Sequence, residues 1–203
     1  SRRLAFSIDE LVTSGSVDDI GAQWLTAMIA GRLAFLVSGG TGTGKTTVLS
    51  ALLGLVAIDA RIVLVEDSAE LRPSHPHVVR LQARTPNIEG SGAISMRDLV
   101  RQSLRMRPDR IVVGEVRGAE VVDLLTALNT GHEGGCGTIH ANSAESVPAR
   151  LEALGLTAGL DRRAVHALVH AGLHAVVHLR RTGDGRRMVA GLYALDRDGE
   201  GYV

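Results

Sequence analysis

The segment Gly39–Thr46 restricts the possible folds of this chain more than any other part of the sequence. It reads Gly-Gly-Thr-Gly-Thr-Gly-Lys-Thr and matches the G-x-x-x-x-G-K-[ST] pattern of a phosphate-binding loop at every fixed position. An apolar run, Leu33–Val37, precedes it, and a helical pattern, Thr46–Val56, follows it. Glycines let backbone N–H groups surround a phosphate, and the start of the helix adds partial positive charge. The sequence therefore predicts a strand, a phosphate loop and a helix, in that order.

The loop pattern also predicts which residues touch a nucleotide. The Lys45 ammonium is expected to reach the β- and γ-phosphates, and the Thr46 hydroxyl to bind Mg²⁺. ATP and Mg²⁺ are therefore the expected cofactors. The alternative is a glycine-rich turn with a chance lysine, and the flanking strand and helix count against it. The predicted nucleotide-binding residues are Gly39, Gly40, Thr41, Gly42, Thr43, Gly44, Lys45, Thr46 and Thr47.

Strand and helix patterns alternate along the rest of the chain. Apolar runs predict further strands at Arg61–Val65, Val78–Leu81, Ile111–Val113 and Gly137–His140. Helices are expected at Ile20–Ile29, Ser95–Met106, Glu120–Leu128, Ser146–Leu154 and Asp161–Ala171. Two final strands predict a hairpin, Ala175–Arg180 with Met188–Leu195. The predicted fold class is α/β, with a mainly parallel sheet, helices on both faces and a C-terminal hairpin.

The domain organisation follows from composition along the chain. Residues 1–19 are polar and rich in turn-forming residues, so they are predicted to be a linker or the remnant of an absent N-terminal domain. Residues 20–203 are predicted to form a single domain, a size that one hydrophobic core can serve.

Charge and aromatic content argue against general nucleic-acid binding. The chain has 22 basic and 22 acidic residues, whereas proteins that bind DNA through its phosphates usually have a basic excess. Aromatic residues make up 2% of the chain, too few for a platform that stacks bases.

A single cysteine, Cys136, excludes an intrachain disulfide. No apolar run is long enough to cross a membrane.

Acidic residues follow two of the predicted strands. Glu66 and Asp67 come directly after Arg61–Val65, and Gly114 and Glu115 come after Ile111–Val113. Hydrolysis of a phosphate ester needs a carboxylate that positions the attacking water. Many phosphate-loop enzymes have an aspartate directly after the second strand, where this chain has Gly114, so the segment is a variant Walker B motif. Which of the two glutamates is the base stays open.

Three segments beyond the phosphate loop resemble motifs of the secretion-superfamily ATPases. Val65–Leu71 resembles their Asp box, Leu104–Gly118 their Walker B motif and Asn129–Ser143 their His box. The spacing of His132 and His140 resembles most the branch of tight-adherence pilus and type IV secretion ATPases. The resemblance covers residues 4–195 and implies a RecA-like P-loop NTPase core.

The resemblance also implies roles for single residues. Glu115 would activate the water, Glu66 would lie in the Mg²⁺–water shell, and His140 would contact the γ-phosphate. Arg117 is a candidate for a contact with the phosphates of a neighbouring subunit. Thr46, Glu66 and Glu115 together are then the predicted Mg²⁺ residues, partly through water.

At the level of the whole protein, the resemblance implies an ATP-hydrolysing motor of a bacterial secretion or pilus-assembly system. Such a motor works as a homo-hexameric ring on an inner-membrane platform protein. It is cytoplasmic and peripheral at the inner face of the cytoplasmic membrane, with no nucleic acid expected as a partner. Two alternatives remain: a DNA-translocating RecA-like motor, and a regulatory module that binds nucleotide with little turnover.

Two periodic patterns have ordinary explanations beside functional ones. Arginines at 97, 101 and 105 share one helix face, which is either solvated or in contact with a neighbouring subunit. Histidines at 166, 170, 174 and 178 have the spacing of metal ligands, but Gly172 interrupts the helix and disfavours a metal site.

Overall fold

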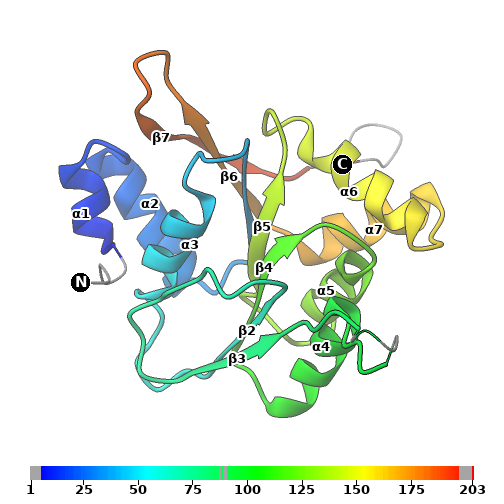
Figure 1. Cartoon of the computed structure of the whole chain (residues 1–203). Coiled ribbons are helices and arrows are strands. Elements are labelled where there is room, and N and C mark those ends of the chain that lie inside the picture. Colours follow the sequence, from blue (N-terminus) through cyan, green and yellow to red (C-terminus); the bar gives the residue numbers. More distant parts are fainter. Residues whose placement is uncertain (1–5, 87, 89–90, 197–202) are drawn as a thin grey trace.

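The described part of the chain forms one seven-stranded sheet in the order β3-β2-β4-β5-β1-β6-β7 (Figure 1). This computed structural model describes residues 6–86, 88, 91–196 and 203. All neighbouring strands pair in parallel except β6 and β7, which form the antiparallel hairpin. The strands are β1 (Phe35–Gly39), β2 (Ile62–Glu66), β3 (Val78–Gln82), β4 (Arg110–Val116), β5 (Cys136–His140), β6 (Ala175–Arg181) and β7 (Arg187–Ala194). The predicted parallel sheet with a C-terminal hairpin is confirmed.

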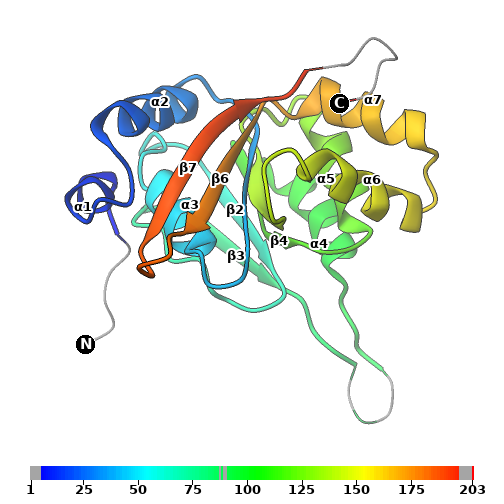
Figure 2. The same cartoon turned by 90° about the horizontal axis from the view of Figure 1, so that it is seen from above.

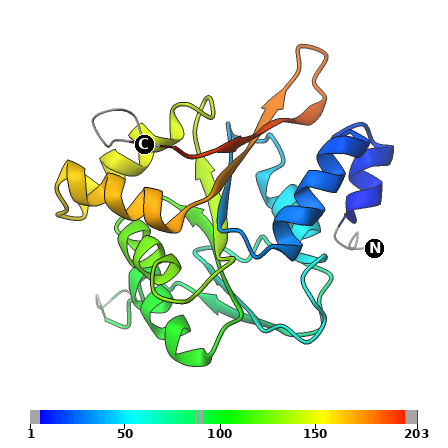
Figure 3. The ribbon, with the colours of Figure 1, turned by 180° about the vertical axis from the view of Figure 1, so that it is seen from behind.

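Helices cover both faces of the sheet, as predicted (Figures 1 and 2). The helices on one face are α1 (Ile8–Thr13), α2 (Asp19–Ala30) and α3 (Lys45–Leu53). Those on the other face are α4 (Met96–Ser103), which a 3₁₀ turn (Leu104–Met106) extends, α5 (Glu120–Leu128), α6 (Val147–Thr157) and α7 (Arg162–Gly172). From behind, the β6–β7 hairpin projects beyond the body of the sheet (Figure 3). Within the described residues, no helix combines the length and apolarity needed to cross a membrane.

Two hydrophobic cores lie between the sheet and the helices, one on each face of the sheet. Successive side chains of a strand point to opposite faces, so β1 contributes to both cores. Leu36 packs with helices α4 to α7, whereas Phe35 and Val37 pack with α1 to α3. Strands β1 and β2 are buried along their whole length, which explains their continuous apolar sequences.

The N-terminal segment, predicted to be a linker or the remnant of an absent N-terminal domain, contains a helix, α1. Ser7 begins α1 with a capping box, in which its side chain and that of Glu10 bond each other's backbone N–H. Leu11 and Val17 are buried in the core beside α3, and Val189 of β7 donates its N–H to Ser16. From Phe6 onward the described segment is therefore part of the folded domain. Its polar residues are helix caps and one exposed helix face.

Strand β4 extends further than the sequence predicts. It continues to Val116, so Gly114 and Glu115 lie within the strand and not after it. Its pairing with β5 shifts register between Val113 and Val116, which marks an irregularity at these two residues.

The carboxyl ends of the parallel strands meet at one edge of the sheet. The phosphate loop leaves β1 there, Glu66 ends β2, Glu115 lies near the end of β4, and His140 ends β5. Ligands of open parallel sheets bind at this edge. The topology thus brings the predicted site residues together from four strands.

Candidate nucleotide site

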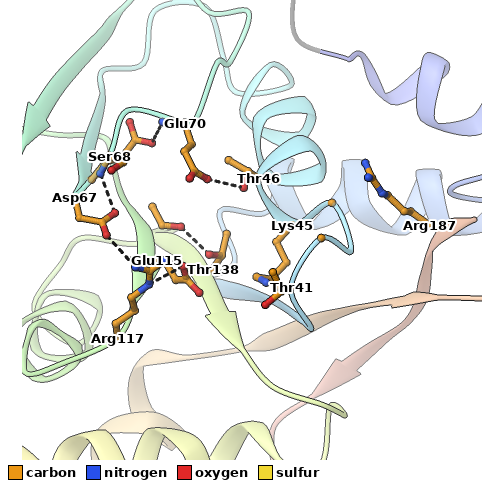
Figure 4. Close-up of a pocket in the computed structure, with 14 residues that line it drawn as sticks. Thr41, Lys45, Thr46, Asp67, Ser68, Glu70, Glu115, Arg117, Thr138 and Arg187 are labelled. Carbon is orange, nitrogen blue, oxygen red and sulfur yellow. Dashed lines mark hydrogen bonds and ion pairs between the residues drawn. The ribbon is translucent and has the colours of Figure 1, made fainter. Parts of the chain in front are cut away.

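A cavity of about 330 Å³ opens at the carboxyl edge of the sheet, above the phosphate loop (Figure 4). Its lining comes from the loop, the ends of β2 and β4, the middle of β5, the segment after β2, and the start of β7. The lining residues are Thr41, Gly42, Gly44, Lys45, Thr46, Glu66, Asp67, Ser68, Glu70, Gly114, Glu115, Arg117, Thr138 and Arg187. Five of the nine predicted loop contacts line the cavity: Thr41, Gly42, Gly44, Lys45 and Thr46.

Two glycines of the loop are required by its geometry. Gly44 has a φ of 95° and precedes the first residue of α3, a left-handed conformation that side chains disfavour. A Cβ on Gly39 would lie 2.6 Å from the Leu179 carbonyl oxygen, too close for any side chain. The loop can therefore wrap tightly between β1 and α3 only with glycine at these positions.

Lys45 lies folded against the loop. Its Nζ donates hydrogen bonds to the carbonyl oxygens of Gly39 and Gly40, each at 3.0 Å. Partial burial lowers the pKa of Lys45, and the nearby Glu115 carboxylate opposes part of that effect. The ammonium is thus held within the loop that the sequence assigns to phosphate.

Glu66 lines the cavity, and its carboxylate accepts hydrogen bonds from backbone N–H groups. It is 2% exposed, and its Oε1 accepts the N–H groups of Glu70 and Leu71 at 2.9 and 2.8 Å. Its Oε2 lies 3.4 Å from a nitrogen of Arg80. These contacts hold the segment that follows β2 and leave Glu66 poorly placed as a base.

The glycine in the variant Walker B motif has a steric cause. A Cβ on Gly114 would lie 2.8 Å from Cγ of Glu66 on the neighbouring strand. An aspartate at this position would collide with that buried side chain. Glu66 therefore fills the space that the usual aspartate would need, and glycine is the residue that fits.

Glu115 and Arg117 form an ion pair inside the same cavity. Nε of Arg117 lies 2.7 Å from Oε2 of Glu115, and Nη2 contacts the same oxygen. Nη1 of Arg117 also contacts Asp67 at 3.1 Å. The hydrogen bond to Glu115 raises the pKa of Arg117 above its ordinary value. Arg117 thus contacts acids of its own chain.

Glu70 is a site residue that the sequence analysis did not single out. Its Oε2 lies 3.4 Å from the Thr46 hydroxyl, on the loop side of the cavity (Figure 4). The available signal was its place in the Asp box segment, four residues after Glu66. Arg187 and Thr138 were missed as well, because they reach the cavity from strands far along the chain.

The oxygen ligands around the cavity suit Mg²⁺, which prefers carboxylates, hydroxyls and water. Thr46, Glu70 and Glu115 present such oxygens from three different elements. The three predicted Mg²⁺ residues, Thr46, Glu66 and Glu115, all line the cavity, and Oε1 of Glu66 accepts two backbone N–H groups.

The two histidines of the His box lie at opposite ends of β5. His140 ends the strand at the edge that carries the phosphate loop, paired in register with Gly39, and its side chain is exposed. It is outside the set that lines the cavity. His132 precedes β5 at the other edge, where its Nδ1 is buried without a hydrogen bond among the described residues.

Several arginines and histidines of the two periodic patterns form hydrogen bonds or ion pairs within the chain. Arg97 and Arg101 both bond Asp123 of α5 at 2.7 Å, so this face contacts a neighbouring helix of the same chain. His166 bonds Glu152, and His178 bonds Ser38 beside the loop.

No cluster of three metal-ligating side chains occurs among the described residues. Cys136 is fully buried, which raises the pKa of its thiol to about 11, so it is a core residue.

Comparison with known proteins provides a family. A family model described as type II/IV secretion system protein matches residues 2–185. A protein of Mycobacterium tuberculosis named for conjugal transfer is 58% identical, over 95% of this chain and 54% of that protein. The conjugal transfer protein TrbB of Rhizobium radiobacter is 37% identical, over 89% of this chain and 54% of that protein. The chain thus spans about half the length of these curated relatives.

Solved structures agree with the fold. The VirB11 ATPase of the Brucella suis type IV secretion system, in complex with sulphate, superposes with a TM-score of 0.76 at 29% identity. The match covers 92% of this chain and 54% of that one. The pilus retraction motor PilT with bound ADP gives a TM-score of 0.68 at 23% identity, over 99% and 56% of the two chains, and supports the fold alone. The predicted RecA-like core is confirmed, and this chain belongs to the type II/IV secretion system protein family.

Proposed function

We propose that this chain is the ATP-hydrolysing domain of a motor in a bacterial secretion or pilus-assembly system. The observation that carries the proposal is one cavity that combines the phosphate-loop residues Lys45 and Thr46 with the carboxylate of Glu115. A loop alone binds phosphate, whereas hydrolysis also needs a carboxylate for the water. Both requirements meet here.

In this mechanism the loop N–H groups and Lys45 bind the β- and γ-phosphates of ATP. Bound Mg²⁺ would neutralise charge on those phosphates. Glu115 accepts the proton of the attacking water. Glu66 is the weaker candidate for that role, because two backbone N–H groups already occupy one of its oxygens. Both contacts of Arg117 go to Oε2 of Glu115, so we assign the proton to Oε1.

His140 and Arg117 complete the proposed site. His140 lies at the same edge as the phosphate loop, which supports a contact with the γ-phosphate once nucleotide and neighbouring subunits are in place. Arg117 can neutralise charge on the phosphates if it leaves Glu115, in its own subunit or in an adjacent one.

The family supports the larger assembly that we propose. The motor would act as a homo-hexameric ring on a platform protein of the inner membrane, from the cytoplasmic side. The chain spans about half of its curated relatives, so these properties are proposed for the whole protein. Head-to-tail contacts between identical chains form a ring when the rotation between subunits closes, and such contacts suit a site that takes arginines from a neighbour.

Replacing Glu115 tests the proposal. Glu115→Gln keeps the shape of the side chain and removes the proton acceptor, so phosphate release should fall by about 10²-fold or more. Binding of a fluorescent ATP analogue should persist. If turnover survives in Glu115→Gln and stops in Glu66→Gln, the roles of the two acids are reversed. Turnover that rises only when DNA is added would favour the DNA-translocating alternative.

A further inference from the structure

The segment after β2 carries two glutamates whose side chains point in different directions. Glu66 is buried, and its Oε1 accepts the backbone N–H groups of Glu70 and Leu71 at 2.9 and 2.8 Å. Arg80 contacts Oε2 of Glu66 at 3.4 Å and also donates to the Leu71 carbonyl at 2.7 Å. The buried carboxylate and Arg80 thus fix the backbone of this segment from both sides.

Glu70 is the residue whose backbone is held in this way, and its side chain turns towards the phosphate loop. Its Oε2 accepts a hydrogen bond from the Thr46 hydroxyl at 3.4 Å, drawn as a dashed line in Figure 4. The negative charge of Glu70 favours a higher pKa of both Lys45 and Arg117, but other nearby groups have a larger effect on each pKa. Glu70 is exposed to solvent, so its carboxylate is free to accept hydrogen bonds from water.

We propose that Glu70 binds the water shell of nucleotide-bound Mg²⁺, and that Glu66 acts only as the positioning residue that holds Glu70 there. The inference rests on the proposed function, because it concerns the metal that accompanies ATP. Mg²⁺ keeps several waters and takes few protein carboxylates. Oε1 of Glu66 accepts two backbone N–H groups, whose release would be unfavourable, and Oε2 of Glu66 lies 3.4 Å from the guanidinium of Arg80. Glu70 needs no such change.

The central measurement is the Mg²⁺ concentration that half-maximally tightens binding of a fluorescent ATP analogue to the purified protein. Glu70→Gln keeps the size of the side chain and removes its charge. Loss of a group that orients metal ligands costs about 10-fold or more in metal affinity, so the Mg²⁺ midpoint should rise by about that factor. Binding measured in EDTA should stay unchanged, and so should the urea midpoint of the nucleotide-free protein.

Asp67→Asn is the matched control. It removes one negative charge from the same segment, at an exposed residue that contacts Arg117 and not Thr46. Because Asp67 also lines the cavity and contacts Arg117, the Mg²⁺ midpoint of Asp67→Asn should rise less than that of Glu70→Gln. An equal rise in Asp67→Asn and Glu70→Gln would reduce the effect to general charge and overturn the inference.

A double mutant separates positioning from direct contact. Glu66→Ala should raise the Mg²⁺ midpoint and also lower the urea midpoint, since the N–H groups of Glu70, partly buried, and Leu71, buried, lose their acceptor. Added to Glu70→Gln, it should raise the Mg²⁺ midpoint no further, because the residue that it positions is already disabled. Additive increases would show that Glu66 meets the metal shell itself. If Glu66→Ala does not fold, the comparison of Glu70→Gln with Asp67→Asn still decides.

The same binding measurements distinguish a failure of the proposed function from a failure of the role proposed for Glu70. Absence of nucleotide binding by the unchanged protein, with or without Mg²⁺, would contradict the proposed function. Normal binding with an unshifted Mg²⁺ midpoint in Glu70→Gln would contradict only the role of Glu70.

Discussion

At the scale of single residues, Lys45 stands out because it is the only lysine among the 22 basic residues of this chain. Arginine serves everywhere else. The loop explains the exception, since the narrow turn between Gly39 and Gly44 admits a compact ammonium on a flexible stem. A planar guanidinium is wider and binds in a fixed fork. The contacts of Nζ with two loop carbonyls show how closely the group fits.

This single lysine allows a direct test of the phosphate loop. Lys45→Ala should remove detectable ATP binding, because the phosphates lose the loop's only cationic side chain. Lys45→Arg should bind ATP poorly as well, although it keeps the charge. Isothermal titration of both variants with ATP is the measurement.

Chemical labelling provides the control with the unchanged protein. An amine-reactive reagent can acylate only Lys45 among the side chains, and burial lowers the pKa of this amine, which increases its neutral, reactive fraction. ATP should protect Lys45 from the reagent. Labelling that ATP leaves unaffected, read by mass spectrometry, would contradict the assignment of the loop.

At the scale of helices and strands, α1 has the clearest energetic consequence. Leu11 is 4% exposed and packs in the core beneath α3, within a segment predicted to be a linker. Leu11→Ala should lower the free energy of unfolding by about 2 to 5 kcal/mol, the usual cost of a cavity in a core. Urea denaturation followed by circular dichroism measures it. Ile20→Ala is the control, since Ile20 is 67% exposed and should change stability by about 0.5 kcal/mol or less. Equal stabilities for both variants would show that α1 unfolds independently.

Some helices, strands and site residues could be predicted from the sequence, whereas others depend on contacts between distant segments. Helix Glu120–Leu128 was predicted with both ends, because its apolar period is strong and a glycine follows it closely. The predicted end of β4 was wrong, since Gly114 and Glu115 were placed after the strand, and the need for that glycine comes from Glu66 on the neighbouring strand. The loop residues Lys45 and Thr46 were predictable from local pattern. Glu70 was not, because its approach to Thr46 depends on a backbone held by a buried side chain.

At the scale of the whole molecule, the distribution of arginines bears on assembly. Arg117 is bound to Glu115 and Asp67, and Arg97 and Arg101 are bound to Asp123, so these arginines are engaged within their own chain. Hydrolysis needs positive charge on the side of the γ-phosphate that faces away from the loop. In a ring, a neighbouring subunit can supply it.

Nucleotide affinity should be independent of protein concentration, because one chain supplies Lys45, Thr46 and the loop N–H groups. Turnover per chain should instead rise as the protein assembles, since an arginine finger contributes about 10³-fold or more to the rate. Phosphate release should be measured with ATP and Mg²⁺ over a range of protein concentrations, with mass from light scattering in the same samples. Turnover per chain that stays constant from monomer to hexamer would show that Arg117 completes the site in its own subunit.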